Sequence, residues 1–129
     1  MKTIKLILNT KNQKYPVVIG SGITKNLSRT FNKYSIKYNR CLLVIDKNIP
    51  KILIKETIKS LSKKKTIVHF FNANEINKNQ LNVNKIVEIL LKNNFHRNDC
   101  LISMGGGITG DVSGFAASVF KRGINFINI

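Results

Sequence analysis

Hydrophobic and polar positions along this chain alternate between the two-residue period of strands and the longer period of helices. Residues 4–8 alternate, and a second apolar run follows at 15–19, so we expect two antiparallel edge strands. Apolar residues then recur at helical spacing over 23–34. The run 42–45 is continuously apolar, as a strand buried on both faces of a parallel sheet requires. The first third therefore predicts a hairpin, a helix and a buried strand.

The same alternation continues to the C-terminus. It predicts a helix with an inward stripe at 54–61, a strand at 66–70, a polar loop at 71–79, a helix capped by Asn79 or Asn82, and strands at 100–104 and 124–129. Strands that alternate with helices form mostly parallel sheets with helices on both faces. The fold class predicted is α/β, a mostly parallel Rossmann-like sheet with an N-terminal antiparallel hairpin.

A glycine cluster at 105–107 follows the apolar run 100–104 and opens a helical pattern with Val112, Phe115 and other apolar residues on one face. Glycine lacks Cβ, so such a turn can take positive φ and lets backbone N–H groups approach a diphosphate. A helix that starts near Thr109 directs its unpaired N–H groups and positive dipole end at the same anion. Strand, turn and helix together predict an anion site.

The glycines fit the G-x-G-x-x-G pattern at Gly105, Gly107 and Gly110, but no Asp or Glu follows Asp111. The ribose-binding acid of a standard Rossmann site, about 20 residues further on, is therefore missing. Asp111 has two interpretations. In the first turn of the helix its carboxylate is stabilised by about 0.3–1 kcal/mol at the dipole, or it contacts a ligand.

The whole string from 105 to 123 reads G-G-G-x-x-G-D-x-x-G-F-x-A-x-x-x-x-R-G. It closely resembles the cofactor-binding signature of the 3-dehydroquinate synthase family, NAD-dependent enzymes of aromatic amino-acid biosynthesis. The resemblance implies that Gly106, Gly107, Ile108, Thr109, Gly110 and Asp111 bind NAD. It also implies that Arg122 reaches a neighbouring subunit's active site and binds the substrate phosphate. Without the family, Arg122 is a solvated cation at a helix end.

Three further residues are candidates for cofactor binding. Asp46 ends the strand 42–45 and can accept hydrogen bonds from ribose hydroxyls, and the family carries an acid after this strand. The family also carries P-x-G-E-x-x-K in the next loop, of which Glu75 and Lys78 remain here, with Asn74 in place of the glycine. Asn tolerates positive φ better than most residues, so the turn can survive. Without the family, Glu75 and Lys78 are an i,i+3 surface pair.

The resemblance implies an enzyme of the shikimate pathway, a phosphate-eliminating lyase that converts 3-deoxy-D-arabino-heptulosonate 7-phosphate to 3-dehydroquinate with NAD and zinc or another divalent metal. The family's metal ligands, its substrate lysines and its all-helical second domain have no counterpart in this sequence. We therefore expect residues 1–129 to be an NAD-binding domain, truncated at its C-terminal end, inactive alone and homodimeric when full length. Another sugar-phosphate cyclase and a related polyol dehydrogenase are the alternatives.

Charge raises a hypothesis of a different class. Twenty-two Lys and Arg against six Asp and Glu give a net charge of +16, which suits a basic nucleic-acid or anion-binding module. However, 18 of these residues are Lys, the only run is 63–65, and few aromatics lie among them to stack bases. We interpret the charge as compositional drift. Binding that weakens steeply with salt would favour the module.

The remaining candidates point to no further chemistry. Cys41 and Cys100 open two apolar runs at no metal-like spacing and are expected to be reduced core thiols. His69 and His96 lack partners at ligand spacing. The N-terminal apolar run is too short for a signal peptide, and no 18-residue apolar span exists, so we expect a cytoplasmic protein without a membrane partner.

Overall fold

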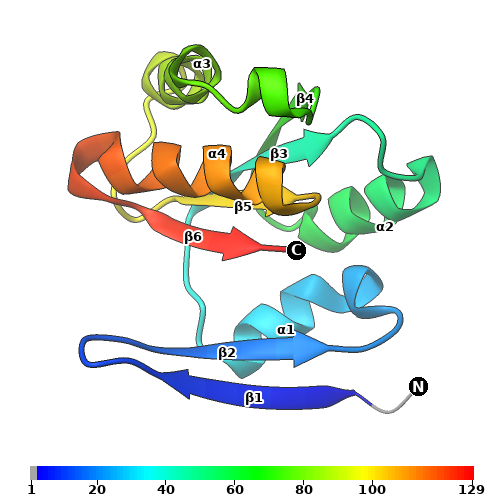
Figure 1. Ribbon diagram of the computed structural model, residues 1–129. Coiled ribbons are helices and arrows are strands. Elements are labelled where there is room, and N and C mark those ends of the chain that lie inside the picture. Colours follow the sequence, from blue (N-terminus) through cyan, green and yellow to red (C-terminus); the bar gives the residue numbers. More distant parts are fainter. Residues whose placement is uncertain (1–2) are drawn as a thin grey trace.

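A computed structural model describes residues 3–129 of the chain (Figure 1). Its elements follow the predicted alternation of strands and helices. They are β1 (Ile4–Asn9), β2 (Lys14–Ile19), a short helix η1 (Ile23–Asn26), α1 (Leu27–Lys33), β3 (Arg40–Asp46), α2 (Lys51–Leu61), β4 (Lys65–Phe71), η2 (Glu75–Asn77), α3 (Gln80–Lys92), β5 (Cys100–Met104), α4 (Gly107–Val119), η3 (Phe120–Arg122) and β6 (Asn125–Asn128).

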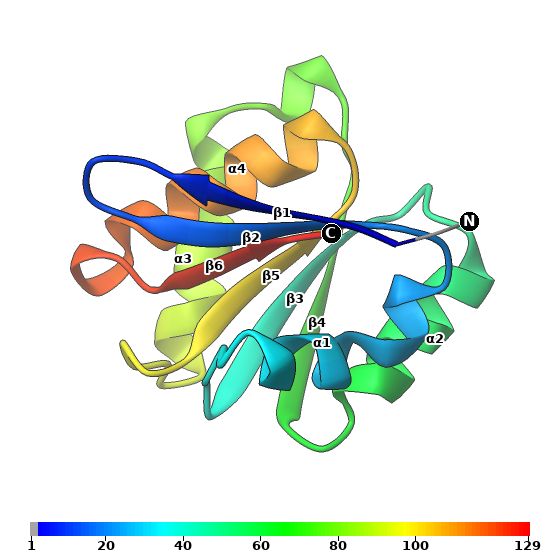
Figure 2. The same ribbon diagram turned by 90° about the horizontal axis from the view of Figure 1, so that it is seen from below.

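Strands β3 to β6 form one parallel sheet in the order β4-β3-β5-β6 (Figure 2). Because successive side chains of a strand point to opposite faces, Leu42 and Val44 of β3 pack under α3 and α4, whereas Leu43 and Ile45 pack against α1 and α2. Each of these four side chains is completely buried. The predicted parallel sheet with helices on both faces is confirmed.

The N-terminal hairpin is not an edge of this sheet. Strands β1 and β2 pair with each other from Ile4↔Ile19 to Asn9↔Lys14 and form a two-stranded sheet of their own. The prediction of two edge strands is wrong in this respect. A groove lined by Val18 of β2 and Ile127 of β6, among other apolar residues, lies between the two sheets instead.

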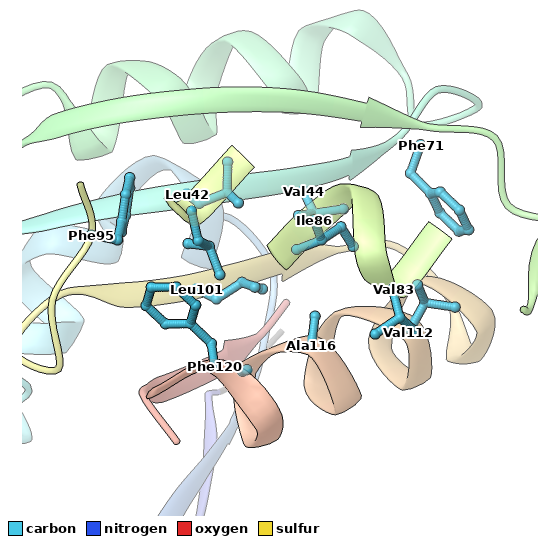
Figure 3. Packing of buried hydrophobic residues seen from close by; sticks show 12 residues of the cluster. Leu42, Val44, Phe71, Val83, Ile86, Phe95, Leu101, Val112, Ala116 and Phe120 are labelled. Carbon is cyan, nitrogen blue, oxygen red and sulfur yellow. The ribbon is translucent and has the colours of Figure 1, made fainter. Parts of the chain in front are cut away.

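A hydrophobic core lies between the sheet and helices α3 and α4 (Figure 3). Ile86 and Leu90 of α3 and Val112 and Ala116 of α4 meet the sheet residues there, and each is at most 3% exposed. Burial of side chains the size of Ile86, Leu90 and Val112 contributes about 1.5–3 kcal/mol each. Packing thus fixes the axis of α4, and with it the direction of its N-terminal end.

Helix α4 differs from the expected pattern in two ways. It begins at Gly107 rather than near Thr109, and Phe115 is 50% exposed rather than part of the core. The helix is able to lie close to β6 because Gly110 and Gly114 face it. A Cβ on Gly110 would lie 3.2 Å from Asn128 Oδ1, and one on Gly114 3.2 Å from Phe126 Cε1. The apolar stripe therefore turns away from Phe115.

The strand register brings together two residues that sequence spacing separates. Cys41 and Cys100 are direct partners on β3 and β5, and both are free and fully buried, as expected of core thiols.

Within residues 3–129 no helix is long and apolar enough to cross a bilayer.

Arg40 connects β3 to the turn before β5. Its Nε lies 3.1 Å from Asp99 Oδ2, Nη1 donates to Asn93 O at 2.9 Å, and the guanidinium carbon lies 4.7 Å from the centre of the Phe95 ring. Asp99 is 2% exposed and also accepts from the His96 N–H at 2.7 Å. Buried ions are tolerated only when their partners are present.

We therefore predict that Asp99→Ala lowers the free energy of unfolding by about 3 kcal/mol, because it leaves the Arg40 guanidinium without its carboxylate. Glu88→Ala, which removes an exposed acid from α3, should change it by less than about 0.5 kcal/mol. Urea unfolding followed by circular dichroism measures both. Equal effects of the two variants would show that the Arg40–Asp99 pair adds nothing to the fold.

Candidate functional site

The strand order reverses at β3, next to the carboxyl ends of β3 and β5. The connection from β3 leads to β4 on one side, and the connection from β4 returns to β5 on the other side of β3. Ligands of open α/β sheets bind at such a reversal of strand order. Asp46 is the last residue of β3 and Gly105 directly follows β5, so both predicted elements lie at this point.

Gly105 is the tightest position in the turn. It has φ 158°, and a Cβ there would lie 2.7 Å from Thr109 Oγ1 and 3.0 Å from Asp46 Cβ. Its N–H donates to Ile129 O at 3.2 Å, which ties the turn to the end of β6. Of the three glycines only this one has positive φ. The glycine at 105 is thus required by contacts within the chain.

Gly106 and Gly107 have the opposite environment. A Cβ on either residue would have no atom within 4 Å, so their backbone faces open space. Gly106 is the N-cap of α4 and Gly107 its first residue. The first amides of a helix have no carbonyl partner within it, and the dipole favours an anion there. Open backbone and unpaired amides together can hold a phosphate group.

The other residues of the turn lie around this opening. Ile108 is half-buried, whereas the Thr109 side chain is completely buried, so only the Thr109 amide can face a ligand. Asp111 is the fifth residue of the helix, and no acid lies in the first turn. Its interpretation as a first-turn carboxylate stabilised by the dipole is therefore wrong.

Asp111 pairs with Lys78. Lys78 Nζ lies 2.8 Å from Asp111 Oδ2, and the two side chains are 45% and 61% exposed. The hydrogen bond and charge of Asp111, with a smaller contribution from Glu75, raise the pKa of Lys78 above its usual value. The alternative prediction, that Glu75 and Lys78 form an i,i+3 surface pair, is wrong, because Lys78 forms its ion pair with Asp111 of α4.

The loop that carries Lys78 is held by its asparagines. Asn74 has φ −155°, and its side-chain oxygen accepts from the Asn77 N–H at 2.8 Å. The expectation that Asn74 takes positive φ in place of a glycine is therefore wrong, since it caps η2 in extended conformation. Glu75 opens η2 and is exposed. Asn79, one of the two predicted caps, accepts from the Asn82 N–H at 3.0 Å and begins α3.

Asp46 sits opposite the glycine turn and is half-buried. Its Oδ1 accepts from the backbone N–H of Asn48 at 3.0 Å and from the Asn48 side chain at 3.1 Å. This contact fixes the carboxylate while Oδ2 can still accept from a ligand hydroxyl, since an ionised carboxyl offers about four lone pairs.

A shallow groove of about 250 Å³ runs beside the turn, between α3 and α4. Lys78 and Asp111 stand on one part of it, and Val83, Val112 and the exposed Phe115 line the rest. Phe115 thus lines this groove, whereas its place in the apolar helical pattern predicted a core residue. The groove offers one cation, one carboxylate and an apolar wall.

Arg122 lies at the other end of the sheet. It follows α4 and precedes β6, and it is exposed with φ 67°. A five-residue strand spans roughly 16 Å, so the length of β5 separates Arg122 from the glycine turn. A hollow of about 610 Å³ there is lined by Arg122, Arg97 and side-chain amides of Gln13, Asn98 and Asn125.

Known proteins resemble this chain in sequence and in fold. The model of the N-terminal region of 3-dehydroquinate synthases matches residues 68–129. The 3-dehydroquinate synthase of Pelagibacter ubique is 60% identical over 129 residues, which is all of this chain and 35% of that enzyme. The chain belongs to the N-terminal part of the 3-dehydroquinate synthase family. It spans about a third of the length of the curated relatives it matches.

Solved structures of two other synthases have the same fold as this chain. A 2-deoxy-scyllo-inosose synthase, solved with carbaglucose-6-phosphate, NAD+ and Co2+, superposes with a TM-score of 0.86 at 18% identity, over 98% of this chain and 35% of that one. The 2-epi-5-epi-valiolone synthase of Streptomyces hygroscopicus, solved with NAD+ and Zn2+, gives 0.75 at 21%, over 95% and 34%. The Rossmann-like fold is confirmed.

The two kinds of glycine in the turn should respond differently to substitution. We predict that Gly105→Ala lowers the free energy of unfolding by about 1–3 kcal/mol, because the new methyl group overlaps Thr109 and Asp46. Gly107→Ala should leave it unchanged or raise it by up to about 1 kcal/mol, since the methyl enters open space and Ala favours a helix. Urea unfolding of both variants is the measurement. If Gly107→Ala is the more destabilising, the turn is not packed as described.

Proposed function

We propose that this chain is the NAD-binding part of a 3-dehydroquinate synthase, which converts 3-deoxy-D-arabino-heptulosonate 7-phosphate to 3-dehydroquinate with loss of phosphate. The observation that carries the proposal is the open backbone of Gly106 and Gly107 beside the reversal of strand order. All 129 residues of this chain align with such an enzyme at 60% identity. NAD supplies reversible oxidation of a substrate hydroxyl, which makes a neighbouring proton acidic enough for elimination.

The described residues fit a dinucleotide. The free amides at the start of α4, from Gly107, Ile108 and Thr109, are placed to hold the diphosphate, and the absence of side chains at Gly106 and Gly107 lets it approach. Asp46 is placed to accept from ribose hydroxyls. Gly110 contributes differently, because it allows α4 to pack on Asn128 and so positions the amides.

Lys78 and Asp111 have linked roles. A lone carboxylate near the start of α4 would repel a diphosphate, and the Lys78 ammonium at 2.8 Å offsets that charge. Asp111 can then accept hydrogen bonds from the dinucleotide, while Lys78 can donate to it. Glu75, on the same loop, makes a smaller contribution to the raised pKa of Lys78 and is a second possible acceptor.

A metal ion does not fit the described residues. Among residues 3–129 no three His, Cys, Asp or Glu side chains gather to hold one. We assign the zinc or other divalent metal of such a synthase to no residue of this chain.

Arg122 is proposed to bind the substrate phosphate in the active site of a second subunit, in a homodimer of the full-length enzyme. Its position at the amino ends of β5 and β6 supports this, because the glycine turn of the same molecule lies at their carboxyl ends. Planar guanidinium suits a bidentate contact with phosphate. The left-handed backbone of Lys121 and Arg122, at φ 46° and 67°, costs roughly 1–3 kcal/mol per residue, a cost that functional positions often carry.

For the cofactor, we predict that Asp111→Ala weakens NAD binding about tenfold or more, because it removes a charge-assisted hydrogen bond of about 1.5–3 kcal/mol. Gly107→Val should weaken it further by blocking the approach to the backbone, with Gly107→Ala intermediate. Glu88→Ala, the same charge change on the outer surface of α3, is the control. Isothermal titration calorimetry measures all four, and unchanged affinity in both Asp111→Ala and Gly107→Val would remove the glycine turn from the site.

For the substrate, we predict that Arg122→Ala raises KM about tenfold to a hundredfold and leaves NAD affinity unchanged. The assay follows phosphate release by a chimera that joins this chain to the remainder of the Pelagibacter synthase, and the 129-residue chain alone should release none. Mixing the Arg122→Ala chimera with one disabled in the second domain should restore partial activity through composite sites. If activity does not return although the subunits exchange, Arg122 does not act across a dimer.

A further inference from the structure

Positive charge is concentrated in the first third of the chain. Residues 1–45 contain nine Lys and Arg and no Asp or Glu, and the first acid is Asp46. Within the described part of the chain, only two cations of this segment have acidic partners. Lys25 pairs with Glu56, and Arg40 pairs with Asp99. The hairpin and α1 therefore carry charge that the fold itself does not neutralise.

Part of this charge converges on one hollow. A space of about 680 Å³ lies between the β1–β2 hairpin and α1. Figure 1 shows the hairpin and this helix facing each other. Lys5 of β1 and Arg29 and Lys33 of α1 line it. Its described lining includes the polar side chains of Asn26 and Asn32 and no carboxylate. The lining is thus cationic and rich in hydrogen-bond donors.

The neighbouring cations affect Lys33. Side-chain contact with Lys5, the charge of Lys5, desolvation and a smaller contribution from the charge of Arg29 lower the pKa of Lys33. Like charges at short range destabilise a fold unless something offsets them. In this hollow the chain brings three positive charges together, and the described lining contains no acid to offset them.

We propose that the hollow between β1 and α1 binds a phosphate-type dianion through Lys5, Arg29 and Lys33. Two ammonium groups and a guanidinium provide charge-assisted hydrogen bonds to several oxygens at once, with the guanidinium able to bind two of them. The volume suits a small ligand. A nucleic acid fits less well, because the surface is concave and Tyr34 is the one aromatic side chain in the described lining.

This site is separate from the nucleotide site. None of its lining residues belongs to the glycine turn or to the groove with Lys78 and Asp111. Because Lys5 lies on the hairpin and the other two cations lie on α1, a bound dianion links these two elements. Its presence should therefore stabilise the N-terminal third of the fold.

The test titrates the 129-residue chain with inorganic phosphate and with glycerol 3-phosphate, at ionic strength held constant with sodium chloride. Backbone amide signals of α1 in NMR spectra give the affinity, and the melting temperature gives the stabilisation. We expect saturable shifts and a melting temperature that rises with either probe. Tighter binding of one probe identifies a free ion or a phosphate monoester as the source.

The decisive variants are Lys5→Gln/Lys33→Gln and, as a second disruption, Arg29→Gln. Each should weaken phosphate binding at least tenfold. Without phosphate the double variant should melt at a higher temperature than the parent chain, because it relieves the repulsion. Lys59→Gln/Lys63→Gln, which removes the same charge from the exposed surface of α2 and the turn after it, should bind phosphate as the parent does.

Three results would overturn the proposal. The first is the absence of saturable shifts in α1 with either probe. The second is equal weakening by the Lys59/Lys63 control, which shows a general effect of net charge. The third is a single-stranded RNA oligomer that binds through the same three residues while both small probes fail, which identifies the occupant as a polyanion.

Discussion

The candidate site depends on the pairing of β3 with β4 on one side and β5 on the other. This pairing, from Cys41↔Cys100 to Ile45↔Met104, sets the carboxyl ends of β3 and β5 side by side where the strand order reverses, the position at which open α/β sheets bind ligands. Asp46 and Gly105 meet there so closely that residue 105 has no room for a Cβ. A shift of one residue in this register would separate the acid from the turn and move every core side chain of β3 to the other face.

The electrostatics at the carboxyl ends of β3 and β5 follow from how α4 is packed. Gly110 and Gly114 let the helix lie against Asn128 and Phe126, and this contact directs the unpaired amides into the opening. The helix end remains electropositive because Lys78 offsets the nearby Asp111. The site therefore combines a rigid backbone surface for an anion with two exposed, mutually neutralised side chains that can exchange partners when a ligand arrives.

Sequence patterns predicted the elements better than their partners. The buried run 42–45 and the glycine cluster identified strand, turn and helix, because burial leaves a hydrophobic period that local sequence records. Strand pairing leaves no such record, so the hairpin was expected at the sheet edge and forms its own sheet. For the same reason the ion pair of Lys78 with Asp111 was not foreseen. The prediction that Phe115 belongs to the core was wrong. Helical spacing does not reveal that Gly110 and Gly114 face β6, an arrangement that leaves Phe115 at the surface.

We propose that this chain binds a dinucleotide beside Gly105, at the carboxyl ends of β3 and β5. Titration of the isotope-labelled 129-residue chain with NAD, followed residue by residue in amide NMR spectra, tests it most directly. We expect saturable shifts at residues 105–111, at Asp46 and at Lys78, with the amides of the β1–β2 hairpin unchanged. Shifts confined to the hairpin and α1, with the glycine turn unaffected, would contradict it.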